Sequence, residues 1–247
     1  MAATEYILMN QDAPVLEFTC RRNEFDEPEF FEGTWHTDYR PIGYRGLAVF
    51  LEHRKAPKHR EHIRQLLEQY GCDDLEGFLQ VTHALSLNDT FWVKRQGDAL
   101  NWSDVSLYTN PFSEVISEAA FDGTISETDF SSTSPEFGTD GYYAKCWIRE
   151  ESGIKLYKSG SAFLEIEPLS EFLASQLAEV ICQQAVQYDL DYYHGKLISK
   201  CSLFTNEMVG LAKASAVFHG AEHTIPDLLR YFQGIRSEDA FRRMCVL

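Results

Sequence analysis

Lys158 and Glu171 are the two residues of this sequence whose types and spacing best suit phosphate chemistry. Lys158 closes the run IKLYK at 154–158, which predicts a short strand, and Glu171 lies near the beginning of a helix opened by Pro168. Strand alternation puts Lys158 and Leu156 on one face. An ammonium drawn toward a core needs an anionic partner, because an unpaired buried charge is costly. Glu171 is the natural partner, and such a pair can hold a lysine toward the phosphates of a nucleotide.

The same two residues also have an ordinary structural interpretation. Lys158 can end its strand in solvent, and Glu171 can occupy the first turn of its helix, where the helix dipole favours an acid. The pair alone does not separate the two interpretations, so the surrounding sequence has to decide.

The elements that would position this pair follow from the pattern of apolar and turn residues. Predicted strands cover 4–9, 14–20, 91–94, 141–150, 154–158 and a hairpin at 191–205 that turns at His194-Gly195. Predicted helices cover 57–70, 74–85, 111–121 with Asn110 as its cap, a helix from 168 with apolar positions Leu169, Phe172, Leu173, Leu177 and Val180, 205–218 capped by Thr205, 224–234, and 237–247. The stretch 21–46 is expected to be irregular. Hairpins alternating with separate helices predict an α+β fold.

A change of composition predicts a domain boundary in the middle of the chain. Residues 111–140 carry seven acids and no Lys, Arg or His, and 122–140 is rich in Ser, Thr and Gly. Such a segment is typical of a loop or linker. We therefore expect an N-terminal domain at 1–121 and a second domain at 122–247.

The formal net charge of −16 argues against direct binding of nucleic acid, because that binding depends on Lys and Arg neutralising phosphates. No apolar run is long enough to span a membrane, and the N-terminus lacks the pattern of a signal peptide. The six cysteines are scattered without metal-binding spacing, which is typical of reduced thiols. We expect a cytoplasmic protein whose partner, if it has one, is a basic or neutral protein.

Other motifs add little chemistry. There is no glycine-rich dinucleotide or Walker-type loop, and the two close histidine pairs lack a third ligand, so no metal site is predicted. The basic cluster from His53 to Arg60 has two interpretations. It is the solvated face of a helix, which we favour, or it docks an acidic segment of the chain.

Several segments, taken in order, resemble a known family. They are SLNDTFWVK at 86–94 with NWSDVSLYTNPFSE after it, SPEFGTDGYYAKCW at 134–147, LYKSGS at 156–161, SEFLASQLAE at 170–179 and SKCSLFTNE at 199–207. Together they resemble the HipA-like serine/threonine kinases, in particular the small bacterial branch of CtkA-type proteins. The resemblance implies an N-terminal accessory domain, a protein-kinase-like small lobe made of an antiparallel sheet and a helix, and the first helices of a truncated large lobe. A role as a toxin is an expectation from the family and does not follow for a chain that lacks the family's catalytic loop.

The resemblance also implies roles for individual residues. Lys158 would contact the phosphates of ATP and pair with Glu171. The loop from 134 to 141 would cover the phosphates, with Lys145 nearby, and the segment 203–206 would be the hinge that meets adenine. The nucleotide-binding residues implied in this way are Lys158, Glu171, Lys145, Ser134, Gly138, Thr139, Gly141, Leu203, Phe204, Thr205 and Asn206. ATP is thus the implied ligand, and Mg²⁺ is implied only together with ATP.

The family's catalytic loop, an Asn-x-Asp-Arg-His type run, does not occur between Met1 and Leu247. Phosphoryl transfer needs a metal and a residue that orients the nucleophile, so we assign no catalytic residue and expect no significant kinase activity. Three interpretations stay open. They are a piece of a full kinase, a shortened natural protein that binds nucleotide or a protein, and an acidic inhibitor or decoy of a basic nucleic-acid-binding protein.

The predicted last helix carries the apolar residues Phe241, Met244, Val246 and Leu247. In a kinase these side chains would pack into the large lobe. Exposed instead, they predict either a homodimer through the C-terminal helices or poor solubility.

Overall fold

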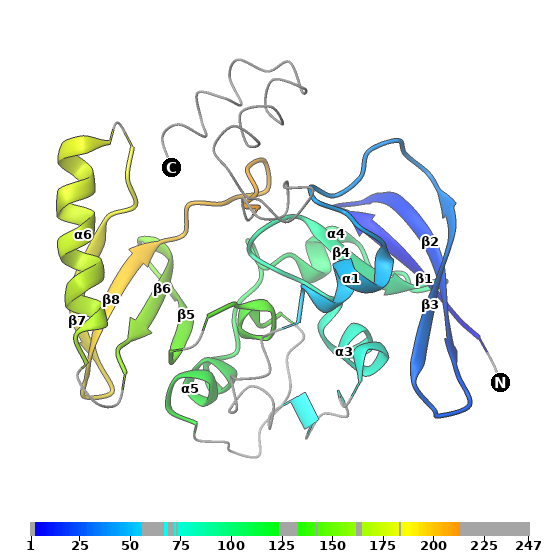
Figure 1. Ribbon diagram of the computed structural model, residues 1–247, viewed down its shortest axis with the longest axis horizontal. Helices are drawn as coiled ribbons and strands as arrows, with labels where there is room; N and C mark the ends of the chain where they lie inside the picture. Colours follow the sequence, from blue (N-terminus) through cyan, green and yellow to red (C-terminus); the bar gives the residue numbers. More distant parts are fainter. Residues whose placement is uncertain are drawn as a thin grey trace.

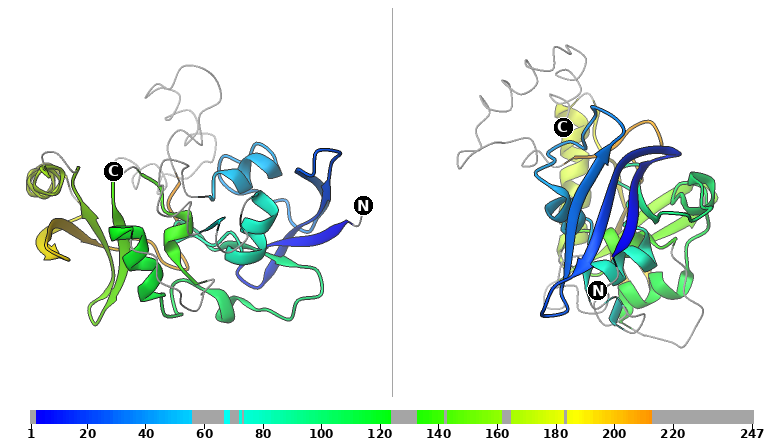
Figure 2. Two further views of the ribbon diagram at one scale, coloured as in Figure 1. Left: turned by 90° about the horizontal axis from the view of Figure 1, so that it is seen from below. Right: turned by 90° about the vertical axis from the view of Figure 1, so that its right-hand side faces the viewer.

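The computed structural model describes residues 3–55, 67–68, 72, 74–123, 133–141, 143–161, 165–182 and 184–212. Within these residues the chain forms two antiparallel four-stranded sheets and five α-helices. The sheets lie at opposite ends of the molecule, and α1, α3, α4 and α5 lie between them (Figures 1 and 2). This mixed architecture agrees with the α+β class expected from the sequence.

The first sheet has the strand order β3-β2-β1-β4. Its strands are β1 (Thr4–Asn10), β2 (Ala13–Arg22), β3 (Pro28–Trp35) and β4 (Phe91–Arg95). The predicted strands at 4–9, 14–20 and 91–94 are confirmed. Strand β3 corrects the expectation that 21–46 is irregular.

Strand β3 forms because its aromatic side chains have somewhere to pack. Phe30 contacts Phe18 of β2 with ring centroids 6.1 Å apart, while the neighbouring Phe31 points outward beneath the guanidinium of Arg21. Pro28 and Gly33 hide the alternation in the sequence. Gly33 fits closely, because a Cβ there would lie 2.9 Å from the carbonyl oxygen of Glu17.

Short helices cover the inner face of the first sheet. They are α1 (Leu47–Glu52) and α3 (Leu75–Thr82), whereas α4 (Trp102–Val105) packs with Met9 and Trp92 in a second core cluster. Helix α3 matches the predicted helix at 74–85 and begins at Asp74, whose carboxylate accepts a hydrogen bond from the amide of Gly77. The helix predicted at 57–70 falls almost entirely outside the described residues.

Helix α5 (Glu114–Asp122) begins three residues later than the sequence suggested, with Ser113 as its cap. The expected cap, Asn110, instead donates its side-chain amide to the carbonyl oxygens of Ser103 and Ser106. Helix α5 packs on both halves: Ile116 belongs to the core beneath the first sheet, and Phe121 packs on the second sheet. The boundary expected after residue 121 therefore lies at the end of a helix that both halves share.

The second sheet has the order β5-β6-β8-β7. Its strands are β5 (Lys145–Glu150), β6 (Gly153–Ser159), β7 (Tyr188–Tyr193) and β8 (Lys196–Ser202), and it carries the helix α6 (Glu167–Ile181). Both predicted hairpins are confirmed, including the turn at His194-Gly195, where both residues have positive φ. Helix α5 covers one face of this sheet through Phe121, and α6 lies on the other face over β7 and β8.

The apolar positions predicted along α6 have the expected helical spacing. Leu169, Leu173, Leu177 and Val180 are exposed, and Phe172 is partly buried. One expectation for the end of the described chain needs correction. Thr205 does not cap a helix, because the chain makes a tight turn closed by Asn206 and Val209. The helices predicted at 224–234 and 237–247, with the dimer contact expected there, lie outside the described residues.

The segment SLNDTF (86–91) joins the two halves. Its carbonyl oxygen at Leu87 accepts hydrogen bonds from the hydroxyls of Thr205 and Tyr108, and that of Asn88 accepts one from the amide of Leu211. Asp89 forms a two-point ion pair with Arg54. The segment SLNDTF is thus a structural junction between the first sheet and the chain that leaves the second.

Arg54 departs from the favoured interpretation of the basic cluster, of which residues 56–60 lie outside the described residues. Its side chain is only 5% exposed, and besides Asp89 it binds the carbonyl oxygens of Ala84 and Phe91. The less favoured interpretation, docking of an acidic internal segment, is correct for this residue.

Among the described residues, no helix is both long enough and apolar enough to cross a membrane.

Candidate functional site

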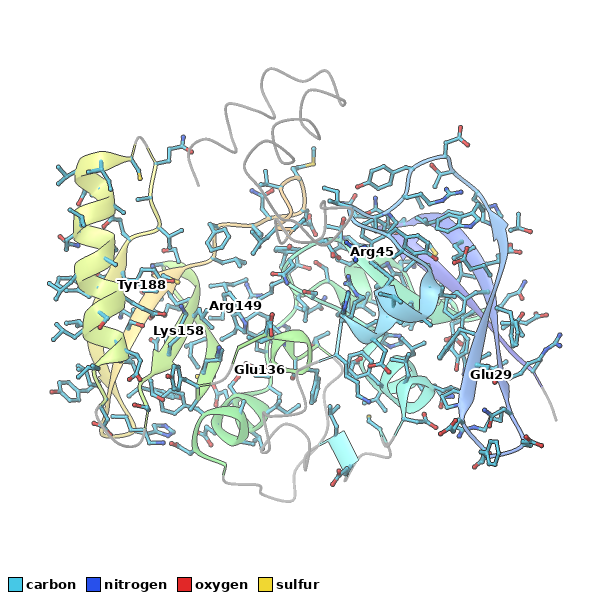
Figure 3. The ribbon with its side chains drawn as sticks, viewed as in Figure 1. Glu29, Arg45, Glu136, Arg149, Lys158 and Tyr188 are labelled. Carbon is cyan, nitrogen blue, oxygen red and sulfur yellow. The ribbon has the colours of Figure 1, made fainter. Side chains whose placement is uncertain are left out.

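The ion pair expected from the sequence is present on the second sheet. The ammonium of Lys158, on β6, lies 2.8 Å from a carboxylate oxygen of Glu171 on α6. The Lys158 side chain is 21% exposed, so it is held at the edge of the protein interior and still reaches solvent. Figure 3 shows Lys158 next to Tyr188, close to α6.

Two further side chains fix this pair. Lys158 also donates to the hydroxyl of Tyr188 at 3.0 Å and lies 4.8 Å from the centre of that ring. The other carboxylate oxygen of Glu171 accepts a short hydrogen bond from the hydroxyl of Ser199, which is fully buried and directly opposite Lys158 on β8. Lys158 is therefore held by β7 as well as by Glu171, and Glu171 is held by β8 as well as by Lys158.

A second lysine lies beside the first. Lys145 on β5 is the register partner of Lys158, so both side chains project from the same face of the sheet. The ammonium of Lys145 donates to the carbonyl oxygen of Asp140 at 2.9 Å. Gly141, with a φ of 104°, leaves the space for it, because a Cβ there would lie 2.0 Å from the Lys145 nitrogen. Two lysines thus stand on the same face of the sheet, and one of them is bound to the end of the loop.

The turn after Lys158 is tied to the first residues of α6. The amide of Ser161 donates to the carboxylate of Glu167 at 2.9 Å, and this hydrogen bond holds the pKa of Glu167 below its usual range. Gly160 packs so closely that a Cβ there would lie 2.6 Å from that carboxylate and 2.7 Å from the Cα of Glu165. The strand and helix that carry Lys158 and Glu171 are thereby held in a fixed relation.

The electrostatics of Lys158 favour its charged form. Burial by itself would lower the pKa of Lys158, but the hydrogen bonds to Glu171 and Tyr188 outweigh burial and raise it. Burial also raises the pKa of Tyr188. At neutral pH the site therefore presents an ammonium ion and a neutral phenol.

This raised pKa predicts a loss of stability at alkaline pH. The protonated Lys158 stabilises the fold fully below the unfolded-state pKa of about 10.4, and its contribution is lost as the pH rises through the higher folded-state pKa. We expect the difference in free energy of unfolding between the wild type and Lys158→Met to be constant from about pH 8 to about pH 9.5 and to shrink above about pH 10.5. Denaturant titration at each pH measures it. A difference that grew with alkaline pH would contradict the assignment.

The loop expected to cover the phosphates lies mostly in the interior. Ser134 is buried, and the residues after it form a short 3-10 helix, Pro135–Gly138, which packs against both halves. Gly138 lies against the backbone, since a Cβ there would be 2.9 Å from the carbonyl oxygen of Leu85. The hydroxyl of Thr139 donates a hydrogen bond to the carbonyl oxygen of Pro135 and accepts one from the indole nitrogen of Trp147. Of the loop positions named, Gly141 is the one in contact with Lys145.

The expected hinge follows β8 directly and contacts the N-terminal half. The amide of Leu203 donates to Ile154, and the amide of Asn206 donates to Val209, so both of these N–H groups are already used within the chain. Thr205 is buried with its hydroxyl on Leu87, while Phe204 is 48% exposed.

Sequence reasoning missed three residues of the site: Tyr188, Ser199 and Glu167. Tyr188 and Ser199 contribute through cross-strand register, which depends on the order β6-β8-β7 and is not visible in any one strand. Glu167 could have been found, because an acid at the first turn of a helix can accept the amides of the preceding turn.

Figure 3 places Glu136 and Arg149 away from this pair, in the region between the second sheet and the N-terminal half. Arg149 donates to the carbonyl oxygens of Leu107, Tyr108 and Asn110, and Glu136 accepts from the amide of Trp147 and the hydroxyl of Ser117. These two charged groups connect the halves, and we assign them no part in ligand binding.

Two surface hollows lie in the N-terminal half, one by Arg22 and one by His83, and neither is lined by Lys158 or its partners. Across the described residues, no group of three or more His, Cys, Asp or Glu side chains is arranged to hold a metal ion.

Comparison of the chain with protein-family models, with curated proteins and with solved structures gave no match. The function of the Lys158 site is therefore argued from its own geometry.

Proposed function

We propose that the second half of the chain is a nucleotide-binding lobe of the protein-kinase type and that Lys158 binds the phosphates of ATP. The observation that carries the proposal is the Lys158–Glu171 ion pair, which joins a sheet strand to the helix that follows it. In protein kinases the same arrangement of a strand lysine and a helix glutamate directs the lysine to the nucleotide phosphates. The proposal extends the resemblance to HipA-like kinases seen in the sequence.

The surroundings of the Lys158–Glu171 pair favour the binding of an anionic ligand over a purely structural role for the pair. Lys158 has one anionic partner and remains partly exposed, and Lys145 projects beside it from the same face. Positively charged side chains that share one face of a sheet attract an anion. A polyphosphate supplies that anion and has several oxygens with which to meet both lysines.

Mg²⁺ enters this proposal only with the nucleotide. The described residues offer phosphate-binding cations and no prearranged cluster of metal ligands, so the metal would bind chiefly through phosphate oxygens, as Mg²⁺ commonly does. We assign no residue of this chain to phosphoryl transfer, and the proposal concerns binding alone.

Replacing Lys158 is expected to weaken ATP binding by about tenfold to a hundredfold. Lys158→Met keeps the length and the apolar stem of the side chain and removes its charge. Lys155→Met is the matched control, because Lys155 lies on the same strand but on the opposite face, where it donates to the hydroxyl of Ser202. Isothermal titration calorimetry with ATP, with and without Mg²⁺, gives the affinities of all three proteins.

The wild type and Lys155→Met should bind alike. A wild-type protein that shows neither heat nor thermal shift up to millimolar ATP would sink the proposal. Equal losses in the two variants would mean only that net charge matters, and the assignment of Lys158 would then be wrong.

A further inference from the structure

A small hollow of about 250 Å³ lies in the N-terminal half, between β4 and the end of α3. The residues that line it are Tyr6, Leu79, Gln80, His83, Val93, Arg95 and Asp98. The topology brings them together. Arg95 is the register partner of Tyr6 across β1 and β4, and Gln80 and His83 lie about one turn apart at the end of α3. The hollow therefore collects polar side chains from a sheet and a helix, at a distance from the Lys158 site.

His83 is presented to this hollow in a fixed orientation. It closes α3 in the left-handed region with a φ of 53°, and Ala84 follows with a φ of 51°. Glycine or asparagine usually fills such a position, because a larger side chain is strained there. The imidazole is held on two sides. Its Nδ1 lies 3.0 Å from the carbonyl oxygen of Val93, and its ring packs edge-on against Trp92 with centroids 6.1 Å apart.

The tautomer of His83 follows from its partner. A backbone carbonyl oxygen can only accept, so the proton is on Nδ1, and in the neutral ring Nε2 carries a lone pair. Burial lowers the pKa of His83 and outweighs the hydrogen bond to Val93 and the charge of Asp98, which both raise it. Among the described residues Nε2 has no hydrogen-bond partner. At neutral pH it can therefore accept an N–H or O–H group of a ligand.

The hollow also contains one cation and one anion. Burial raises the pKa of Tyr6, and hydrogen bonds from Gln80 and Arg95 lower it in part, which places the Arg95 guanidinium at that hydroxyl. Arg95 and Asp98 are both exposed. Within the described part of the chain neither forms an ion pair, with the other or elsewhere. Opposite charges that line one small hollow without pairing leave space for a ligand that meets both.

These groups select a zwitterion over a simple ion. A plain carboxylate would pair with Arg95 but lie against Asp98, and a plain amine would pair with Asp98 but lie against Arg95. An α-amino acid avoids both conflicts. Its carboxylate matches the guanidinium fork, and its ammonium group has three N–H donors, enough for Asp98 and for Nε2 of His83. Its size also suits the hollow, which is smaller than the range of about 300–1,000 Å³ typical of drug-sized ligands.

We propose that this hollow binds a free α-amino acid, with its carboxylate on Arg95 and its ammonium group on His83 and Asp98. Binding orders little of the protein, because the imidazole is already held by Val93 and Trp92. The site lies in the N-terminal half, so it does not depend on the nucleotide proposal for Lys158.

The test begins with thermal-shift measurements of the wild type with each proteinogenic L-amino acid at about 10 mM. At least one should raise the unfolding temperature, and isothermal titration calorimetry then gives its affinity. His83→Asn should bind that amino acid about tenfold more weakly. Asparagine tolerates the positive φ and can keep the bond to Val93, but it lacks Nε2. His36→Asn is the matched control and should bind as the wild type does, because His36 contacts Glu17 on the surface.

Two charge variants complete the test. Arg95→Gln and Asp98→Asn lie at exposed positions, so both should fold, and each should weaken binding about tenfold. The N-acetyl and carboxamide derivatives of the amino acid each lack one charge and should bind more weakly than the parent. The proposal is overturned if no amino acid shifts the unfolding temperature, or if either derivative binds as tightly as the parent. Equal affinities of the wild type and His83→Asn, or of the wild type and both charge variants, would also overturn it.

Discussion

Arg54→Met is expected to lower the free energy of unfolding by about 3 kcal/mol or more. The guanidinium is nearly enclosed and satisfies three groups at once: the carboxylate of Asp89 at 2.8 and 2.9 Å, the carbonyl oxygen of Ala84 at 2.5 Å and that of Phe91 at 2.7 Å. Methionine would fill much of the volume and leave these acceptors without their donor. The loss is large because the two carbonyl oxygens left behind belong to the buried residues Ala84 and Phe91.

Urea denaturation of the wild type and two variants measures this effect. Arg40→Met is the matched control, because Arg40 is exposed, stacks over Trp35 and donates to the carbonyl oxygen of Thr37. It should cost less than about 1 kcal/mol. If Arg54→Met cost no more than Arg40→Met, the junction would not depend on the buried arginine.

A double-mutant cycle with Asp89→Asn identifies the partner. Asp89 also accepts the amide of Phe91, and an asparagine oxygen can keep that bond. The two substitutions together should cost less than the sum of their separate effects by about 1–3 kcal/mol, since Arg54 and Asp89 share one contact. Additive effects would mean that the carbonyl oxygens, and not the carboxylate, account for the stability.

The sequence predicts the elements whose periodicity is undisturbed. The β1–β2 hairpin, both hairpins of the second sheet, α3 and α6 each have a clear alternation or helical spacing, and the structure has all of them. Strand β3 is not predicted, because Pro28 and Gly33 interrupt the alternation of its apolar side chains. The cap of α5 was misplaced because Asn110 and Ser113 are both good caps, and tertiary contacts decide between them.

The site shows the same division. The Lys158–Glu171 pair joins consecutive elements, so chain order was enough to suggest it. Tyr188 and Ser199 reach the pair through strand register, and Asp89 reaches Arg54 through a contact 35 residues apart. Such partners depend on the three-dimensional arrangement. The exposure of Leu169, Leu173 and Leu177 on α6 is hidden from the sequence for a related reason: apolar spacing reveals a face and not what covers it.

Phe137→Ala is expected to lower the free energy of unfolding by about 3–5 kcal/mol. Phe137 is 1% exposed and belongs to the core beneath the first sheet, although the sequence placed it in a loop over the nucleotide. Truncating it leaves a cavity at the contact between the two halves. Phe25→Ala, at a site that is 75% exposed, is the control and should change stability by less than about 0.5 kcal/mol.

This variant also separates two roles for the loop. A loop that closed over phosphates would have to move when nucleotide binds, so its aromatic side chain would add little to the stability of the free protein, and its loss would mainly weaken ATP binding. An anchored loop gives the opposite result, a large loss of stability and an unchanged affinity in the protein that stays folded. The second outcome would confine phosphate contact to Lys145, Lys158 and the residues next to Gly141. In that case the buried part of the loop fixes the sheet to the rest of the molecule, and the proposed nucleotide contacts are left to the lysines of the second sheet.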